Sequence, residues 1–347
     1  MSGPDILFVA SNRNPELFRH DPSFVYRCEN LGLALTELGL KVDYRHLTAL
    51  PTRKVVRVAV FHRPIASSRL WYLLRKLRQH GVKVLADFDD LIFDESLASF
   101  SPGVLNSLVP YWKTWWRFLS HRTAMSWFDG ITVSTEPLAD HAHGMSPSLQ
   151  VMQLHNCVHH SWRNASEQAD RIVREKVITY FPGTRSHDRD FAEIAGPLSR
   201  FLYGHPEVRL EITGRGDFAI DARLGQVRHQ ERLSFSEYQS RVQSGWVNIA
   251  PLENTPFNQA KSALKIMEAG YWGVPTLCSP NADNRRFSAA GAVIAEHGEQ
   301  WHDHLERLLM PEEYQAVTVE LQEKITALAD VYQQARRFTD CWLSTGC

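Results

Sequence analysis

The sequence has 347 residues, with 38 Lys and Arg against 39 Asp and Glu and a net charge of −1. This length suits two domains of ordinary size, and the balanced charge argues against a nucleic-acid partner. The first residues lack the pattern of a secretion signal, no stretch approaches about 20 apolar residues, and the cysteines are scattered without a CxxC pair. We therefore predict a cytoplasmic protein with reduced thiols.

The first part of the chain alternates β-rich runs with amphipathic segments. Strands are predicted at DILFVA, VVRVAVFH, VKVLAD, DGITVS and LQVMQL, and helices between them at 26–38, 68–79, 111–125 and 136–142. Strands separated by helices of this length indicate parallel βαβ units. The periodicity fails over 156–171, where polar residues dominate, and this stretch is typical of a linker.

A second alternation follows the linker. Strands are predicted at KVITYF, VRLEIT, QVRHQERL, WVNIAP, GVPTLCS and AVIAEHG, with a helix from about 189 to 203 and helical composition over 311–337. We predict two doubly wound α/β domains, 1–160 and 173–311, and a helical segment, 312–347, that packs back toward the first domain. Such sheets bind ligands beyond the carboxyl ends of their strands, which places the expected site between the domains.

The stretch PLENTPFNQAKSALKIMEAGYWGVPT (251–276) carries an unusually charged helix face. Asn258 is a good N-cap, so the free N–H groups near 260–262 are predicted to hold a phosphate beside Lys261. Lys265 and Glu268 follow at spacings of four and three, which places them on the face of Lys261. The alternative is a solvated face with an ordinary Lys–Glu pair.

Residues 256–279 resemble the nucleotide-sugar signature of GT-B fold glycosyltransferases, especially the family-four-like "group 1" enzymes of bacterial surface-polysaccharide synthesis. The resemblance implies two Rossmann-like domains facing a central cleft, with Lys261 and Ser262 on the diphosphate and Glu268 on the ribose. Many of these enzymes carry a glutamate where this sequence has Ala260. The donor-sugar contact of that glutamate is therefore missing or supplied by another group, such as Asn258, and retaining stereochemistry does not follow.

A second segment, YFPGTRSHDRDF (180–191), resembles the SGTPTHDRDF loop of the same enzymes. Gly183 permits close backbone approach, Thr184 offers a hydroxyl, and Arg185 or His187 is suited to phosphate or donor sugar. The alternative is an ordinary βα loop, and we expect Asp188 to cap the following helix.

Acidic residues cluster in VLADFDDLIFDE (84–95), which resembles the DDxxFD segment of these enzymes. Asp89 or Asp90 is the candidate base or acceptor-orienting group. Capping and a metal-binding Asp87–Asp89 pair are the alternatives, but no metal is expected because a lysine and a helix end already serve the phosphate. Candidate acceptor-side residues lie after the first predicted strand, at Tyr26 and Arg27, and at the end of the second, at His62 and Arg63.

Segment Tyr111–Arg122 mixes tryptophans with basic residues. Trp112, Trp115 and Trp116 recur at helical spacing, which fits either a membrane interface or a helix packed on the core.

The sequence predicts a metal-independent glycosyltransferase that uses a nucleotide-diphosphate sugar and a glycan or lipid-linked acceptor, in the cytoplasm or at the inner face of the membrane. The alternatives are a GT-B fold sugar-nucleotide epimerase and a catalytically silent sugar-nucleotide binding subunit. The sequence does not indicate the sugar, the base, the acceptor, the stereochemistry or the oligomeric state.

Overall fold

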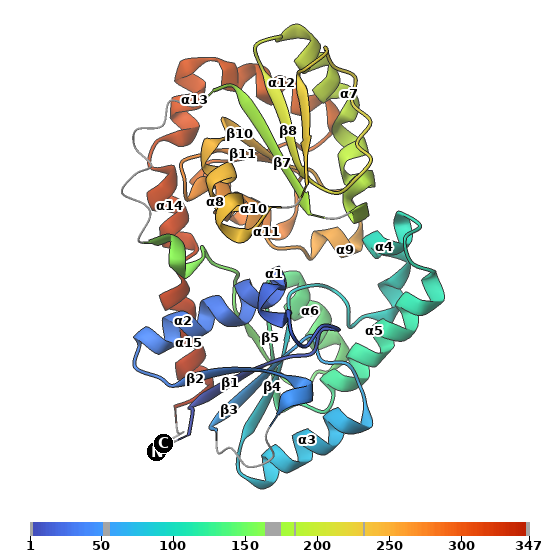
Figure 1. Cartoon of the computed structure of the whole chain (residues 1–347), viewed down its shortest axis with the longest axis vertical. Helices are drawn as coiled ribbons and strands as arrows, with labels where there is room; N and C mark the ends of the chain where they lie inside the picture. Colours follow the sequence, from blue (N-terminus) through green and yellow to red (C-terminus); the bar gives the residue numbers. More distant parts are fainter. Residues whose placement is uncertain (1–2, 51–55, 164–174, 184, 232, 345–347) are drawn as a thin grey trace.

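The computed structural model describes residues 3–50, 56–163, 175–183, 185–231 and 233–344. It contains two α/β domains, one above the other in Figure 1, each built on a six-stranded parallel sheet. The alternating pattern of the sequence therefore correctly predicted two doubly wound sheets.

The first sheet has the order β2-β1-β3-β4-β5-β6. All residues of β1 and β3 are buried, as expected for central parallel strands covered on both faces. The strands are β1 (Ile6–Ala10), β2 (Val42–His46), β3 (Val58–His62), β4 (Lys83–Phe88), β5 (Gly130–Val133) and β6 (Gln150–Gln153). The helices are α1 (Pro22–Phe24), α2 (Asn30–Glu37), α3 (Ser68–Gln79), α4 (Pro102–Leu105), α5 (Tyr111–Met125) and α6 (Glu136–Met145).

The second sheet has the order β12-β11-β10-β7-β8-β9. Its strands are β7 (Val177–Gly183), β8 (Arg209–Gly214), β9 (Val227–Gln230), β10 (Val247–Ala250), β11 (Thr276–Cys278) and β12 (Ala292–Ile294). The helices that follow β7 are α7 (Asp188–Gly204), α8 (Phe235–Ser244), α9 (Pro256–Gln259), α10 (Leu264–Gly270), α11 (Ala282–Arg286), α12 (Gly298–Leu309), α13 (Pro311–Thr318), α14 (Leu321–Leu328) and α15 (Val331–Trp342).

The last helix, α15, belongs to the core of the first domain. Ala335, Phe338 and Trp342 pack in the same buried cluster as Ile6 and Phe8 of β1. Figure 1 shows the chain leaving the second domain along α14 and running down beside α2. The chain therefore crosses between the domains twice, once after β6 and once before α15.

Strand order reverses at one place in each sheet. In the first sheet β1 lies between β2 and β3, and in the second β7 lies between β8 and β10. Such a place is called a switch point, and ligands of doubly wound sheets bind there, beyond the carboxyl ends of the strands. The expected sites therefore follow Ala10 and His62 in one domain, and Gly183 and Ala250 in the other.

Three local expectations concerned helix ends and helix length. The segment after β1 is divided into α1, a π-helical turn (Val25–Glu29) and α2 rather than one regular helix. Asp188 is the first residue of α7 rather than its cap, and its carboxylate instead accepts the N–H of Asp217. None of the helices in the described residues is long and apolar enough to cross a membrane.

Candidate functional site

A cavity of about 210 Å³ opens at the switch point of the second sheet. Its walls come from the ends of β7 and β10 and from the segment before α10. Four predicted donor-binding residues line it, namely His187, Lys261, Ser262 and Lys265. The cavity therefore lies where the topology of the sheet places a ligand.

The helix expected over 258–270 is broken into α9 and α10. Thr255, not Asn258, caps α9, since its hydroxyl accepts the N–H of Asn258 at 3.1 Å. The N–H groups of Ala260 and Lys261 bond to the carbonyls of Phe257 and Asn258, so the prediction of free N–H groups near 260–262 is wrong at both residues. The break places Lys261 and Ser262 in a short connection, where both are half-buried.

The ammonium of Lys261 has no direct partner at this cavity. It forms no hydrogen bond or ion pair with another described residue, whereas that of Lys265 donates to Tyr238 at 2.6 Å and to Glu268 at 2.9 Å. Ser262 is held by the first domain, because Asn156 Nδ2 donates to its hydroxyl at 2.9 Å. An unpaired ammonium in a partly buried site favours an anionic ligand.

Glu268 is buried beneath two tyrosine hydroxyls. Only 2% of its surface is exposed, and its Oε1 and Oε2 accept the hydroxyls of Tyr26 and Tyr238 at 2.5 Å each. Burial and the adjacent carboxylate raise the pKa of both tyrosines well above the usual value, so both hydroxyls remain donors. The carboxylate predicted to bind the ribose therefore already accepts two hydroxyl donors. One of them, that of Tyr26, comes from the first domain.

His187 is oriented by a residue that the sequence interpretation did not select. Its Nδ1 lies 2.7 Å from Asp190 Oδ2, and Asp190 Oδ1 accepts Asn258 Nδ2 at 3.0 Å. Asp190 thereby links the two predicted sugar-side residues. Its position in the sequence HDRD, three residues after the histidine, was the available indication.

The remaining residues of the β7 loop differ in their surroundings. Gly183 has a φ of +76°, a left-handed backbone conformation that favours glycine. Arg185 projects outward, with 61% of its side chain exposed. Thr184 lies outside the described residues.

In the first domain, the side chains beside the switch point form a buried ion-pair network. Arg27 Nη2 lies 2.6 Å from Asp87 Oδ1, and His62 Nδ1 lies 2.9 Å from Asp87 Oδ2. Thr132 also donates to Asp87 Oδ1, at 2.7 Å. Although burial opposes ionisation, Arg27 and His62 hold the pKa of Asp87 well below its usual value.

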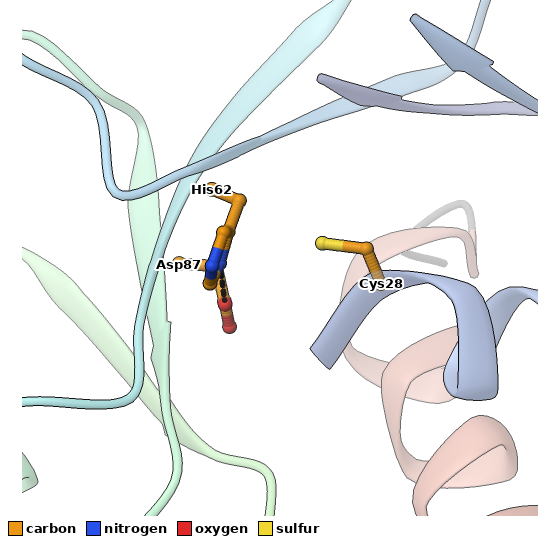
Figure 2. A group of neighbouring side chains, drawn as sticks. All are labelled: Cys28, His62 and Asp87. Atoms are coloured by element: carbon orange, nitrogen blue, oxygen red, sulfur yellow. Dashed lines mark hydrogen bonds and ion pairs between the residues drawn. The ribbon is translucent and has the colours of Figure 1, made fainter. Parts of the chain in front are cut away.

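Cys28, His62 and Asp87 form a candidate cation site by proximity alone. One ligand atom of each lies within 4.8 Å of the others, and Figure 2 shows the Cys28 sulfur directed from its helix toward the His–Asp pair. Burial raises the pKa of the Cys28 thiol well above its usual value. With Arg27 already on the carboxylate and the thiol protonated, this donor set does not suit a cation.

Asp89 and Asp90 share the guanidinium of Arg63. Nε of Arg63 donates to Asp89 and its Nη2 to Asp90, each at 2.6 Å, and Ser23 donates to Asp89 at 2.5 Å. Arg63 adopts a φ of +46°, which is rare for a residue other than glycine and occurs often at functional sites. Burial raises the pKa of Asp89, but Arg63 outweighs it and lowers the value to about 2.

The two switch points face each other across the domain boundary. Besides the Tyr26–Glu268 and Asn156–Ser262 bonds, the hydroxyl of Thr135 donates to the carbonyl of Ala260 at 2.8 Å. Ala260 is only 1% exposed and packs in the core cluster of the first domain. Its methyl group is thus covered by the opposite domain.

Tyr111–Arg122 forms most of α5 and presents aromatic side chains outward. Trp112 and Trp116 are 60% and 61% exposed, whereas Trp115 is partly buried against the core. Core packing, one of the two interpretations, therefore holds for Trp115, while Trp112 and Trp116 lie on the exposed face of the same helix.

The sequence matches no family model and no curated protein. Similar solved structures span nearly the whole chain. Sucrose-phosphate synthase from Thermosynechococcus elongatus has 12% identity and a TM-score of 0.63 over 97% of this chain and 98% of its own. Anabaena Alr3699/HepE in complex with UDP and glucose has 8% identity and a TM-score of 0.60 over 99% and 100%. The α,α-trehalose 6-phosphate synthase from Burkholderia multivorans has 14% identity and a TM-score of 0.60 over 99% and 99%. The chain therefore has the GT-B fold, which confirms the predicted fold class.

Proposed function

We propose that this protein is a glycosyltransferase that moves a sugar from a nucleotide-diphosphate sugar to a carbohydrate or lipid-linked glycan. One observation carries the proposal: the unpaired ammonium of Lys261 lines a cavity at the switch point of the second sheet of a GT-B fold. The similarity of the fold to nucleotide-sugar enzymes, one of them described with UDP and glucose, supports the same assignment.

The diphosphate would lie against Lys261 and Ser262. Lys261 supplies a compact positive charge, and the Ser262 hydroxyl supplies a donor whose position is set by Asn156. These groups would stabilise the negative charge that develops on the departing nucleotide, a role for which donors oriented in advance are effective.

The ribose would bind Glu268 by exchange of hydroxyl groups. The two oxygens of Glu268 now hold the hydroxyls of Tyr26 and Tyr238. The two vicinal hydroxyls of a ribose offer the same number and kind of donor. Nucleotide binding would therefore release Tyr26, which belongs to the opposite domain, and loosen one contact between the domains.

On the acceptor side, we propose that Asp89 and Asp90 orient an acceptor hydroxyl. A carboxylate whose pKa is lowered to about 2 is a weak proton acceptor near neutral pH, which argues against Asp89 as the base. Arg63 would then hold these two carboxylates in place. Arg27 and His62 would hold the neighbouring Asp87, and Tyr26 would hold the contact between the domains.

The proposed reaction uses no metal. Asp87 and Asp89, the candidate metal-binding pair, are each paired with an arginine, and a divalent cation beside a guanidinium is unfavourable. Lys261 would supply the positive charge that the diphosphate requires.

We further propose that the enzyme works in the cytoplasm, at the inner face of the membrane. Trp112 and Trp116 are exposed on α5 beside Lys113, a combination that suits an anionic lipid surface. Cosedimentation with vesicles containing phosphatidylglycerol should fall when both tryptophans are changed to serine, and should be unaffected by the partly buried Trp115→Phe. Equal cosedimentation of the double variant and the wild type would remove this part of the proposal.

A thermal-shift screen of nucleoside diphosphates tests the proposed function directly. A nucleotide at 100 times its Kd should stabilise the protein by about 2.7 kcal/mol. Absence of any shift contradicts the proposal. Formation of an epimer or glycal from a nucleotide sugar without an acceptor would identify an epimerase instead, and polysaccharide synthesis that survives Lys261→Ala would identify a silent binding subunit.

A further inference from the structure

Asp190 joins three segments of the donor-side wall. Its carboxylate accepts His187 Nδ1 at 2.7 Å, the N–H of Glu253 at 2.8 Å and Asn258 Nδ2 at 3.0 Å. The residue is 3% exposed and lies in the first turn of α7, where a negative charge is favourable. Although burial raises the pKa of Asp190, His187 and Lys261 lower it below its usual value, so the group is a carboxylate.

The hydrogen bonds of this carboxylate determine which nitrogen of His187 carries the proton. An ionised carboxylate can only accept, so the hydrogen must be on Nδ1. In a neutral imidazole, Nε2 then carries a lone pair. Burial and the ammonium of Lys261 lower the pKa of His187, while Asp190 and Asp90 act in the opposite direction without reversing the shift.

His187 is one of the residues that line the cavity. The ring lines the cavity together with Lys261 and Ser262, and its Nε2 has no hydrogen-bond partner among the described residues. A lone pair repels the oxygens of a diphosphate but accepts a hydroxyl. Lys261 is suited to the phosphate, which leaves His187 suited to the sugar.

We propose that His187 Nε2 accepts a hydroxyl of the transferred sugar and that Asp190 is the positioning residue that aims it. This inference rests on the proposed function and assigns the sugar-reading group within the same site. Asp190 also holds Asn258, and His187 lies within electrostatic range of Lys261.

Calorimetric titration of the full chain tests the inference. The ligands are the nucleoside diphosphate with the largest thermal shift and the glucose and N-acetylglucosamine esters of that nucleotide. His187→Gln and Asp190→Asn should each weaken the better-bound ester about tenfold, the effect of one hydrogen bond, while the free diphosphate changes little. Asp188→Asn, in the same helical turn but outside the His187–Asp190 pair, is the matched control.

The pH dependence of ester binding separates positioning from a merely structural role. Neutral His187 is the binding form, so affinity falls as the pH drops through its pKa. Asp190→Asn removes a charge that favours the imidazolium and leaves Lys261 and Asp90 unchanged. The fall in affinity on the acid side of the pH profile, the acid limb, should therefore move to lower pH. His187→Gln should abolish the acid limb. If Asp190→Asn does not fold, His187→Gln still tests the inference, because it leaves the other two bonds of Asp190 intact.

Three results would overturn the inference: equal losses for the diphosphate and the esters, no loss for either, or an acid limb that Asp190→Asn leaves in place. Equal losses would place His187 on the phosphate. A wild-type protein that binds no nucleoside diphosphate contradicts the proposed function instead.

Discussion

The two switch points differ in whether their charged side chains have partners. In the first domain the three carboxylates at the end of β4 are each paired with an arginine: Asp87 with Arg27, and Asp89 and Asp90 with Arg63. In the second domain Lys261 lines a cavity without a partner among the described residues. A buried charge that is paired contributes to the structure, whereas an unpaired charge at a cavity is free to bind a ligand of opposite sign. We call the ion pairs of Arg27 and Arg63 the framework, and the cavity beside Lys261 the binding site.

The largest effect is expected from breaking the framework. Arg27→Met leaves the carboxylate of Asp87 buried without its main partner, which should lower the free energy of unfolding by about 3–5 kcal/mol. Urea denaturation measures this loss. Arg19→Met, which breaks the more exposed Arg19–Glu29 pair, should cost less than about 1 kcal/mol, and similar losses for both variants would contradict the distinction.

A substitution in the binding site should change ligand affinity more than stability. Lys261→Ala removes an unpaired charge, so the free energy of unfolding should change by less than about 0.5 kcal/mol. The affinity for a nucleoside diphosphate should fall about 10- to 100-fold, because a charged hydrogen bond is lost. Calorimetry measures both quantities against Lys324→Ala, which changes a partly exposed lysine of α14. A destabilised variant with unchanged affinity would place Lys261 in the framework.

Acid titration should expose the charge pairing of Asp89. Its folded pKa of about 2 lies below the unfolded value of about 3.9, so the group contributes about 2.6 kcal/mol above about pH 5. That contribution is lost as the pH falls from about 5 toward about 2. Arg63→Met should remove this acid-dependent component, as measured by urea denaturation at several pH values, whereas Arg78→Met at the exposed Asp129 pair should retain it.

The smallest effect concerns the contact between the two regions. Tyr26→Phe removes a hydroxyl that competes for Glu268, so a nucleoside diphosphate should bind about fivefold more tightly. Tyr44→Phe, in the same domain but away from Glu268, should leave the affinity unchanged. Weaker binding by Tyr26→Phe would show that Tyr26 supports the nucleotide rather than competing with it.

Much of the site could be predicted because its segments are local. The strand ends that carry Gly183, His187 and Asp89 follow from periodicity, and parallel sheets gather ligands at such ends. The N-cap assignment failed because Thr255 competes with Asn258 for the same role. Asp190 was missed because a carboxylate in the first turn of a helix is ordinary in sequence, and only its three bonds distinguish it.

The sequence by itself determined the two doubly wound sheets and the motifs at their strand ends, because strand and helix periods are local properties of the chain. Only the tertiary structure decided which charges are paired. The bond from Tyr26 to Glu268 joins residues 242 positions apart, and the break before α10 leaves Lys261 in a short connection between helices. Such pairings depend on how the domains pack, because a hydrogen bond forms only when donor and acceptor are brought within about 3 Å.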